Sequence, residues 1–468
     1  MLALSLLAGG SALIVALRPA AATIATYTIP LGQRSDLTPS IVLDAHSRRA
    51  FVPTWVIGSA VGYISMLETT HNTLLRAVPV SIPFGTPAVD ERRGHVFVPV
   101  NAANGTVVEM LDTRNGRLLH TTSVGFDAGP AIDNRSSHVF VLQSGAYACP
   151  GAPMCSNGTG NVSVLDAVTG RSLRHFTIPG QGDSGKIMAD EPQGRLILIR
   201  RNPLNNTAMI DTLDTTNGRL VRQIAVPLPG GSYWRSPVVD APVNRVFVAI
   251  DNVANGGPLN TSDLYVLDAR SGTVVRHLTI RRILGDMAVD ERLGHVYATS
   301  YGATALLAIQ RPGGFMAMEA PAGAGEVRVL DARTGALLQT IPIKSAAANI
   351  AVDRRRERLF VVSAGLVVAG PAGLAGIDAA PGTVSVLDEH GGRLLGTATV
   401  GVNPGAIAVD ERTGRAYVVD NGGLVRPADD WKWVPGGVRR LLPFVPPPPG
   451  RPMVNAPVSV TVVDATRV

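Results

Sequence analysis

A pair of motifs that recurs eight times along the chain predicts an all-β, eight-bladed β-propeller. One motif has the form of AVDERRGHVFV (88–98), and the other has the form of VRVLDARTGALLQTIPI (327–343). Each pair offers four short segments rich in Val, Ile and aromatic residues, separated by tight turns. Four strands in a repeat of roughly 40–50 residues are typical of a propeller blade.

The first motif ends its first strand at an aspartate, and the second motif ends its strand at another acidic residue. The first set is Asp44, Asp90, Asp133, Asp190, Asp240, Asp290, Asp353 and Asp410, and the second is Glu68, Asp112, Asp166, Asp214, Asp268, Asp331, Asp388 and Asp464. A carboxylate that opens a turn accepts hydrogen bonds from backbone amides two or three residues later. These acids are therefore predicted to cap turns rather than to bind calcium or to form catalytic pairs.

The two ends of the repeat array predict how the ring closes. The eighth unit stops at VTVVDATRV (460–468) and has only three strands, whereas residues 25–31 resemble the fourth-strand stretch 338–343. We expect the N-terminal strand to complete the last blade, which also removes two unpaired sheet edges. A seven-bladed ring is the alternative if the first or fourth unit pairs differently.

Repeats such as AIAVDERTGRAYVVDN (406–421), each followed by a VxVLD strand, resemble the YVTN-type β-propeller repeat family, which includes the YncE-like extracytoplasmic proteins. The resemblance covers nearly everything from residue 24 onward. It implies the fold and says little about function, because such propellers serve many roles.

The beginning of the chain indicates export. Residues 1–17 carry no charged side chain and RPAAA follows, so residues 1–22 are predicted to be a signal peptide or an N-terminal anchor. Residues 23–468 then form a single propeller domain, expected to be an extracytoplasmic monomer: secreted, periplasmic or on the cell surface. If retained, residues 1–17 provide a membrane tether. The two cysteines, Cys149 and Cys155, are predicted to form a local disulfide rather than a metal site.

The spacing of the acids locates the variable surface. From the second acid to the next first aspartate the distance is 21 to 26 residues, whereas within a unit it runs from 22 to 54. The length variation therefore falls in the connection between the second and third strands. Variable loops on a scaffold are where recognition is commonly found, so we assign function to this face.

The longest insertion (422–457) belongs to blade eight and combines tryptophans with cations. Its candidates for partner binding are Trp431, Lys432, Trp433, Arg439 and Arg440. This composition is typical of an interaction hot spot and suits a protein or glycan partner, or single-stranded nucleic acid. The alternative is a loop that folds over the end of the propeller. The Gly-, Ala- and Pro-rich loops of blade six (300–325) and blade seven (364–382) are expected to pack between neighbouring blades; the alternative is that they shield a central pocket or dock a partner.

The crossings between blades should surround the mouth of the central channel. The candidates for a ligand in this funnel are Asp127, Asp183, Lys186, Tyr233, Trp234, Arg235, Asp286 and Asn403. A polar, wet mouth without a ligand is the alternative. The chain has no Cys-x-x-Cys-His, GxSxG, Walker or dinucleotide motif. The sequence thus favours a binding scaffold with no metal or cofactor, and an enzyme with a funnel site is the alternative.

Overall fold

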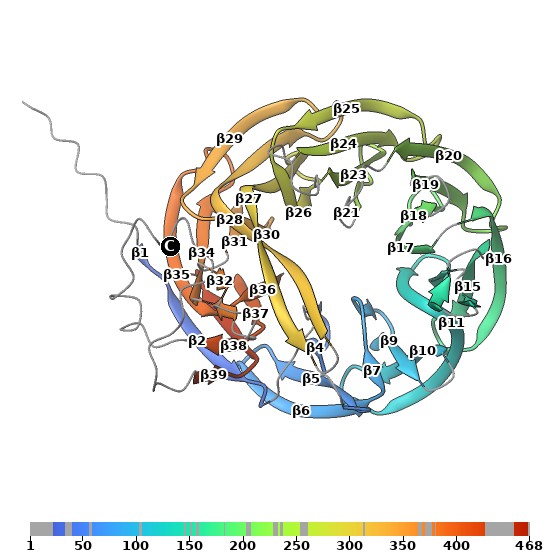
Figure 1. Ribbon diagram of the computed structural model, residues 1–468, viewed down its shortest axis with the longest axis horizontal. Helices are drawn as coiled ribbons and strands as arrows, with labels where there is room; N and C mark the ends of the chain where they lie inside the picture. Colours follow the sequence, from blue (N-terminus) through green and yellow to red (C-terminus); the bar gives the residue numbers. More distant parts are fainter. Residues whose placement is uncertain are drawn as a thin grey trace, which may run out of the picture.

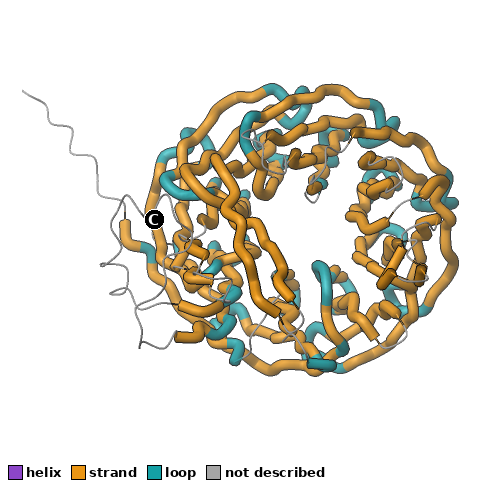
Figure 2. Tube along the Cα trace, in the orientation of Figure 1, coloured by secondary structure: helices purple, strands orange, loops and turns teal. Residues whose placement is uncertain are grey.

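The computed structural model shows eight blades arranged as a ring around a central axis (Figures 1 and 2). It describes residues 22–32, 40–55, 59–102, 105–144, 147–149, 152–155, 159–181, 183–202, 207–227, 233–234, 237–252, 261–311, 314–363, 367–369, 377–379, 381–425 and 454–466. Within these ranges there is no helix, and none therefore that could span a membrane. The prediction of eight blades is confirmed.

The blades follow one another along the chain. Blade one contains β3 (Val42–Asp44), β4 (Arg49–Trp55), β5 (Gly62–Glu68) and β6 (Thr73–Val80). Blade two contains β7 (Ile82–Pro83), β8 (Ala88–Asp90), β9 (His95–Ala102), β10 (Gly105–Asp112) and the start of β11 (Leu118–Asp133). Blade three contains the end of β11, β12 (His138–Ser144), β15 (Thr159–Asp166) and β16 (Ser172–Gln181). Blade four contains β17 (Asp183–Asp190), β18 (Arg195–Asn202), β19 (Thr207–Asp214) and β20 (Leu220–Pro227).

Blade five contains β21 (Tyr233–Trp234), β22 (Val238–Asp240), β23 (Arg245–Asn252), β24 (Thr261–Asp268) and β25 (Val274–Ile280). Blade six contains β26 (Ile283–Asp290), β27 (His295–Arg311), β28 (Gly314–Asp331) and β29 (Leu337–Ile343). Blade seven contains β30 (Ala347–Asp353), β31 (Arg358–Ser363), β34 (Pro381–Asp388) and β35 (Leu394–Val402). Blade eight contains β36 (Pro404–Asp410), β37 (Arg415–Asp420), β40 (Ser459–Asp464) and the N-terminal strand β2 (Ala25–Pro30).

The N-terminal strand closes the ring as predicted. β2 pairs antiparallel with β40 from Ala25 opposite Asp464 to Pro30 opposite Ser459. Its Ile29 is buried in the cluster that joins blades eight and one. A two-residue strand, β1 (Ala22–Thr23), adds a parallel pairing with β35 of blade seven. The start of the described chain is thus attached to both of the last two blades.

The repeated acids cap turns, as the sequence predicts. Asp290 Oδ1 accepts the backbone N–H groups of Arg292 at 2.7 Å and Leu293 at 3.2 Å. In the second set, Asp331 Oδ1 accepts the N–H of Thr334 at 2.7 Å. Every acid of the first set has at most 3% of its surface exposed. No cluster of three or more metal-ligating side chains occurs among the described residues.

In the described residues, eight hydrophobic clusters each join a pair of neighbouring blades, and a small ninth cluster contains Ile283, Tyr301 and Ala346. A large residue near the middle of each second strand fills each of these interfaces: Phe51, Phe97, Phe140, Ile197, Phe247, Tyr297, Phe360 and Tyr417, all fully buried. Because no blade can bury its faces alone, the ring is stabilised as a whole.

Candidate functional site

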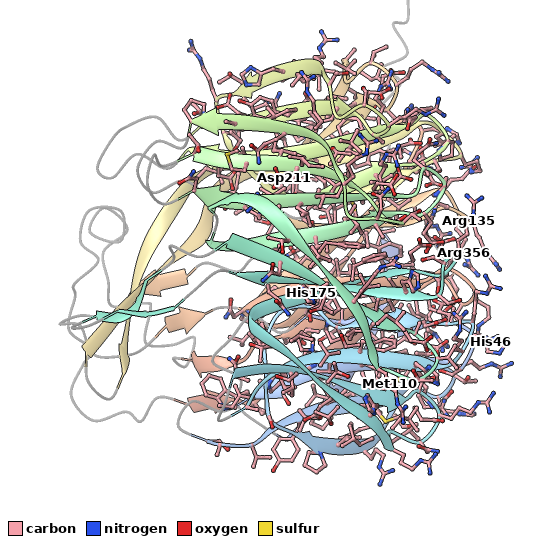
Figure 3. The ribbon with its side chains drawn as sticks, turned by 90° about the vertical axis from the view of Figure 1, so that its right-hand side faces the viewer. His46, Met110, Arg135, His175, Asp211 and Arg356 are labelled. Atoms are coloured by element: carbon pink, nitrogen blue, oxygen red, sulfur yellow. The ribbon has the colours of Figure 1, made fainter. Side chains whose placement is uncertain are left out.

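The two faces of the ring differ in the connections they carry. The tight-turn face is formed by the turns between first and second and between third and fourth strands of each blade. The long-loop face carries the connections between second and third strands and the blade-to-blade crossings. Figure 3 shows the turn residues His46, Arg135 and Arg356 on one side of the ring and the projecting hairpins on the other.

Four connections on the long-loop face contain additional β-strands. In blade six, β27 and β28 continue far beyond the blade, and their pairing runs without a break from Ala303 opposite Ala322 to Arg311 opposite Gly314. Blade seven adds β32 (Val367–Ala369) and β33 (Ile377–Ala379), and blade eight adds β38 (Gly423–Val425) and β39 (Val454–Ala456). The expectation of loops was therefore wrong for the described residues of 300–325 and, in blade seven, for 367–369 and 377–379, because backbone pairing forms strands there.

The hairpins of three consecutive blades form one raised structure. β27 contacts β32, and β33 contacts β38. Figures 1 and 2 show the outer half of the β27–β28 hairpin running across the middle of the ring, and Figure 3 shows it standing out from the long-loop face. We call the outer part of β27–β28 together with β32–β33 and β38–β39 the platform. It is the largest departure from eightfold regularity in the part of the chain that the structure describes.

The partner-binding candidates belong to the insertion of blade eight. Trp431, Lys432, Trp433, Arg439 and Arg440 lie outside the described residues. The insertion leaves and re-enters the blade through β38 and β39, where Val425 is paired with Val454. The insertion therefore begins and ends at adjacent residues of the platform. The assignment of these five residues to partner binding stays a prediction.

The cysteines lie in a fourth hairpin, β13 (Tyr147–Cys149) with β14 (Ala152–Cys155), on the insertion of blade three. In its ladder Cys149 is opposite Ala152 and Tyr147 is opposite Cys155. The backbone thus brings the two cysteines into one short hairpin. Their side chains lie outside the description, so the disulfide stays a prediction.

The structure describes the funnel candidates to different extents, and it brings no ligand site together from those whose side chains are described. For Asp127, Asp183, Tyr233 and Trp234 only the backbone is described, on β11, β17 and β21, and Arg235 lies outside the described residues. Asn403 has a positive φ of 52° and its carbonyl accepts the N–H of Asn421 at 3.1 Å, so it is a turn residue. Asp286 Oδ1 accepts the N–H of Met287 at 2.9 Å, which makes it a local cap within β26. Lys186 is exposed on β17.

The innermost strands present small apolar residues between the mouth and the buried aspartates. In blade eight this stretch is Ile407–Val409, and its residues are half-buried. The corresponding stretch of blade six is Met287–Val289, and that of blade seven is Ile350–Val352. In these three blades the channel wall next to the buried aspartates is thus apolar. The polar candidates Lys186 and Asp286 lie one position nearer the long-loop face.

One buried polar cluster breaks the repeat and was not predicted. Glu389 follows the second acid of blade seven, where the other blades have Thr or Ala. Its side chain is buried, and the hydroxyl of Tyr297 in blade six donates a hydrogen bond to its Oε1 at 2.9 Å. Burial, with the adjacent Asp290 carboxyl, raises the pKa of Glu389 to about 8. A comparison of the eight repeats at this position would have revealed the exception.

Several charged and titratable groups surround Glu389. Arg292 lies 3.8 Å from its Oε2 and 3.7 Å from Asp290 Oδ2, and forms a closer ion pair of 3.0 Å with Glu357. His295 Nδ1 lies 3.2 Å from the Tyr297 hydroxyl, and burial lowers the pKa of that imidazole. His390 contacts Glu357 at 2.8 Å. The cluster joins blades six and seven on the tight-turn face, opposite the platform, and can hold a proton between two buried carboxyl groups.

The comparisons with known proteins agree on the fold. No family model and no curated protein matches the sequence. A quinohemoprotein alcohol dehydrogenase from Pseudomonas putida HK5 is similar in structure, with a TM-score of 0.50 and 14% identity over 96% of this chain and 76% of that one. Sqt1 from Saccharomyces cerevisiae has a TM-score of 0.53 and 10% identity over 95% and 98% of the two chains.

A europium-containing methanol dehydrogenase is also similar, with a TM-score of 0.52 and 12% identity over 94% of this chain and 92% of that one. Proteins with unrelated names thus share this architecture, and at such low identity the likeness extends to the fold alone. The chain is an eight-bladed β-propeller.

Proposed function

We propose that this propeller is an extracytoplasmic scaffold that binds a protein partner through the platform and the blade-eight insertion. The observation that carries the proposal is the asymmetry of the ring. All the additional hairpins in the described ranges lie on the long-loop face, whereas the opposite face carries short capped turns. Function on rigid scaffolds is concentrated in such variable connections.

The platform has the form of a recognition surface. Its hairpins come from blades six, seven and eight and contact one another, so a partner can meet a continuous surface rather than separate loops. The sequence of the insertion between β38 and β39 contains Trp431, Trp433, Arg439 and Arg440. Trp and Arg are enriched among residues that dominate binding energy.

We also propose that the protein is located outside the cytoplasm and belongs with the YVTN-type or YncE-like proteins. It is supported by the uncharged stretch 1–17, the following Ala-rich site and the cysteine pair. Native mass spectrometry of the protein from the envelope or medium of its host tests this part. A chain that begins near residue 23 and has lost two hydrogens supports cleavage and the disulfide, and an intact reduced chain contradicts both.

The binding proposal is tested by site-specific cross-linking. A photo-reactive residue at position 432 is introduced into the full chain in its native envelope, and the cross-linked protein is identified and purified. Trp431→Ala with Trp433→Ala should then weaken its affinity more than tenfold, which is about 1.4 kcal/mol. Arg355→Ala, an exposed change on the tight-turn face, should leave the affinity unchanged.

A second variant tests the hairpin of blade six. The pair Tyr301 and Gly325 is equivalent to the pair Arg201 and Ala208 in blade four, so residues 302–324 can be replaced by the short connection 202–207. The blade stays intact, and binding should fall. Full affinity in both the Trp431→Ala with Trp433→Ala variant and the hairpin variant contradicts the proposal. Binding of single-stranded DNA with a steep loss at high salt would identify a nucleic acid as the partner instead.

A further inference from the structure

The exposed large apolar side chains of this protein are concentrated in one ring-shaped zone. Of the twelve among the residues whose side chains are described, ten lie within the first three residues of an outermost strand. We call these ten residues the girdle: Tyr27, Leu74, Leu75, Leu118, Leu173, Val274, Val275, Leu337, Leu338 and Leu394. Their exposure ranges from 37% to 53%. Every blade except the fourth contributes.

The pairing register puts the girdle at the edge of the tight-turn face. Leu118 is opposite Leu111, Leu337 is opposite Leu330, and Leu394 is opposite Leu387. In each case the partner immediately precedes the acid that caps the turn to the outermost strand. The girdle residues of successive blades therefore lie at the same height, and Val168, within one of these turns, is exposed beside them. The twelfth exposed residue, Val61, belongs to a connection on the long-loop face.

The charges within the girdle have one sign. We consider the first six residues of each outermost strand together with the residue before it. These eight segments contain no Asp or Glu and eight arginines: Arg76, Arg117, Arg171, Arg174, Arg219, Arg222, Arg276 and Arg393. All eight are exposed. Exposed aliphatic side chains interspersed with arginines are typical of surfaces that lie on anionic lipid.

The N-terminal end of the described chain leaves the ring at the girdle. Ala22 is opposite Gly396, two residues from Leu394, and β1 runs parallel to β35 away from the tight-turn edge. The chain before Ala22 therefore joins the ring at that edge. It contains the stretch 1–17, which has no charged side chain. The apolar stretch thus precedes, in the sequence, the point at which the described chain joins the girdle edge.

We propose that the girdle rests on the surface of an anionic lipid bilayer, with the tight-turn face toward the membrane and the platform directed away from it. A plane laid against that edge can contact all the contributing blades at once, whereas a second copy docked at the side of the ring would cover only one or two of them. This orientation does not depend on the binding partner of the platform.

Hydrogen exchange of the full chain tests the orientation. The protein is compared without vesicles, with phosphatidylcholine vesicles and with vesicles of phosphatidylcholine and phosphatidylglycerol. We expect amide exchange in the turns between third and fourth strands, such as 331–337 and 388–394, to slow several-fold with the anionic vesicles only, and the protection to weaken at high salt. Protection of the platform, or equal protection by neutral vesicles, would overturn the proposal.

Variants separate the girdle from the N-terminal segment, which can hold the chain to a bilayer by itself. Leu74→Ser, Leu75→Ser, Leu337→Ser and Leu338→Ser in one chain should abolish the turn protection even where the chain stays attached. Arg117→Gln, Arg171→Gln, Arg219→Gln and Arg393→Gln in another should do the same and remove the salt dependence, and they keep the proposal testable if the serine variant does not fold.

Val61→Ser is the matched control, because it removes an exposed valine from the opposite face. It should retain full protection. Turn protection that is unchanged in both girdle variants overturns the proposal, as does a self-association of the wild type, measured by light scattering without lipid, that both girdle variants abolish. Affinity for a platform partner is measured separately, so a failure here leaves the proposed function untouched.

Discussion

At the scale of single residues, the most informative position is Glu389, because it is the one place where a repeat exchanges Thr or Ala for a buried acid. A pKa raised to about 8 means that the folded state favours the protonated carboxyl. The resulting stability is fully present at acidic pH and is lost as the pH rises from the ordinary range of a glutamate through about 8.

Glu389→Gln should remove this pH dependence. A neutral amide needs no proton, so the variant should gain stability over wild type by about 1–2 kcal/mol at pH 8.5 and by much less at pH 5. Urea denaturation at several pH values measures the difference. If the unfolding free energies of the two proteins depend on pH in the same way, Glu389 is already ionised in the folded protein. Asp290, Arg292, His295, Tyr297, Glu357 and His390 face this group and must be kept unchanged.

The ion pair of Arg200 and Asp211 makes a second prediction at this scale. Both side chains are buried in blade four; Arg200 Nε donates to Asp211 Oδ2 at 2.7 Å, and Gln223 Nε2 donates to Oδ1 at 2.7 Å. Arg200→Met leaves the carboxylate without its cation and should cost about 3–5 kcal/mol of unfolding free energy. Arg200→Met with Asp211→Leu should cost less than the single change. A double variant less stable than the single one contradicts this account.

At the scale of elements, the turn between third and fourth strands is packed against the preceding blade. Gly392 has a φ of 65°, and a Cβ there would lie 2.5 Å from Ile341 Cδ1 of blade six. Gly294 has a φ of 67° with no atom within 4 Å of such a Cβ. Gly392→Ala should therefore cost about 2–4 kcal/mol, and Gly294→Ala about 1 kcal/mol from backbone strain alone. Equal losses in thermal denaturation would show that the contact with Ile341 relaxes.

Some strands could be predicted from the sequence and others could not. The four strands of each blade and the closing strand β2 could be predicted, because their alternation and capping acids are local signals. The outer halves of β27 and β28 could not, because Gly, Ala and Pro carry little strand preference and pairing alone makes them strands. The contact between Tyr297 and Glu389 could not be predicted either, because it joins residues 92 positions apart. The parallel pairing of β1 could not be predicted because it involves only two residues.

At the scale of the whole molecule, closure makes the ring a single cooperative unit. Removal of residues 1–31 leaves β40 paired with β37 only and removes the buried Ile29 and Leu31 from the cluster between blades eight and one. The truncated protein should melt at a clearly lower temperature and self-associate through the open edge. Removal of residues 1–21 keeps β2 and should leave the melting temperature near that of the full chain. Calorimetry and light scattering measure both effects.

The pairing of Tyr27 with Val462 also determines when the ring can close during synthesis of the chain. A chain made from its N-terminus can assemble blades one to seven as they emerge, but β2 has no antiparallel partner until β40 has been synthesised. Contacts between such distant parts of a chain form slowly. The ring can therefore close only after β40 has been synthesised, and until then β2 lacks its antiparallel partner.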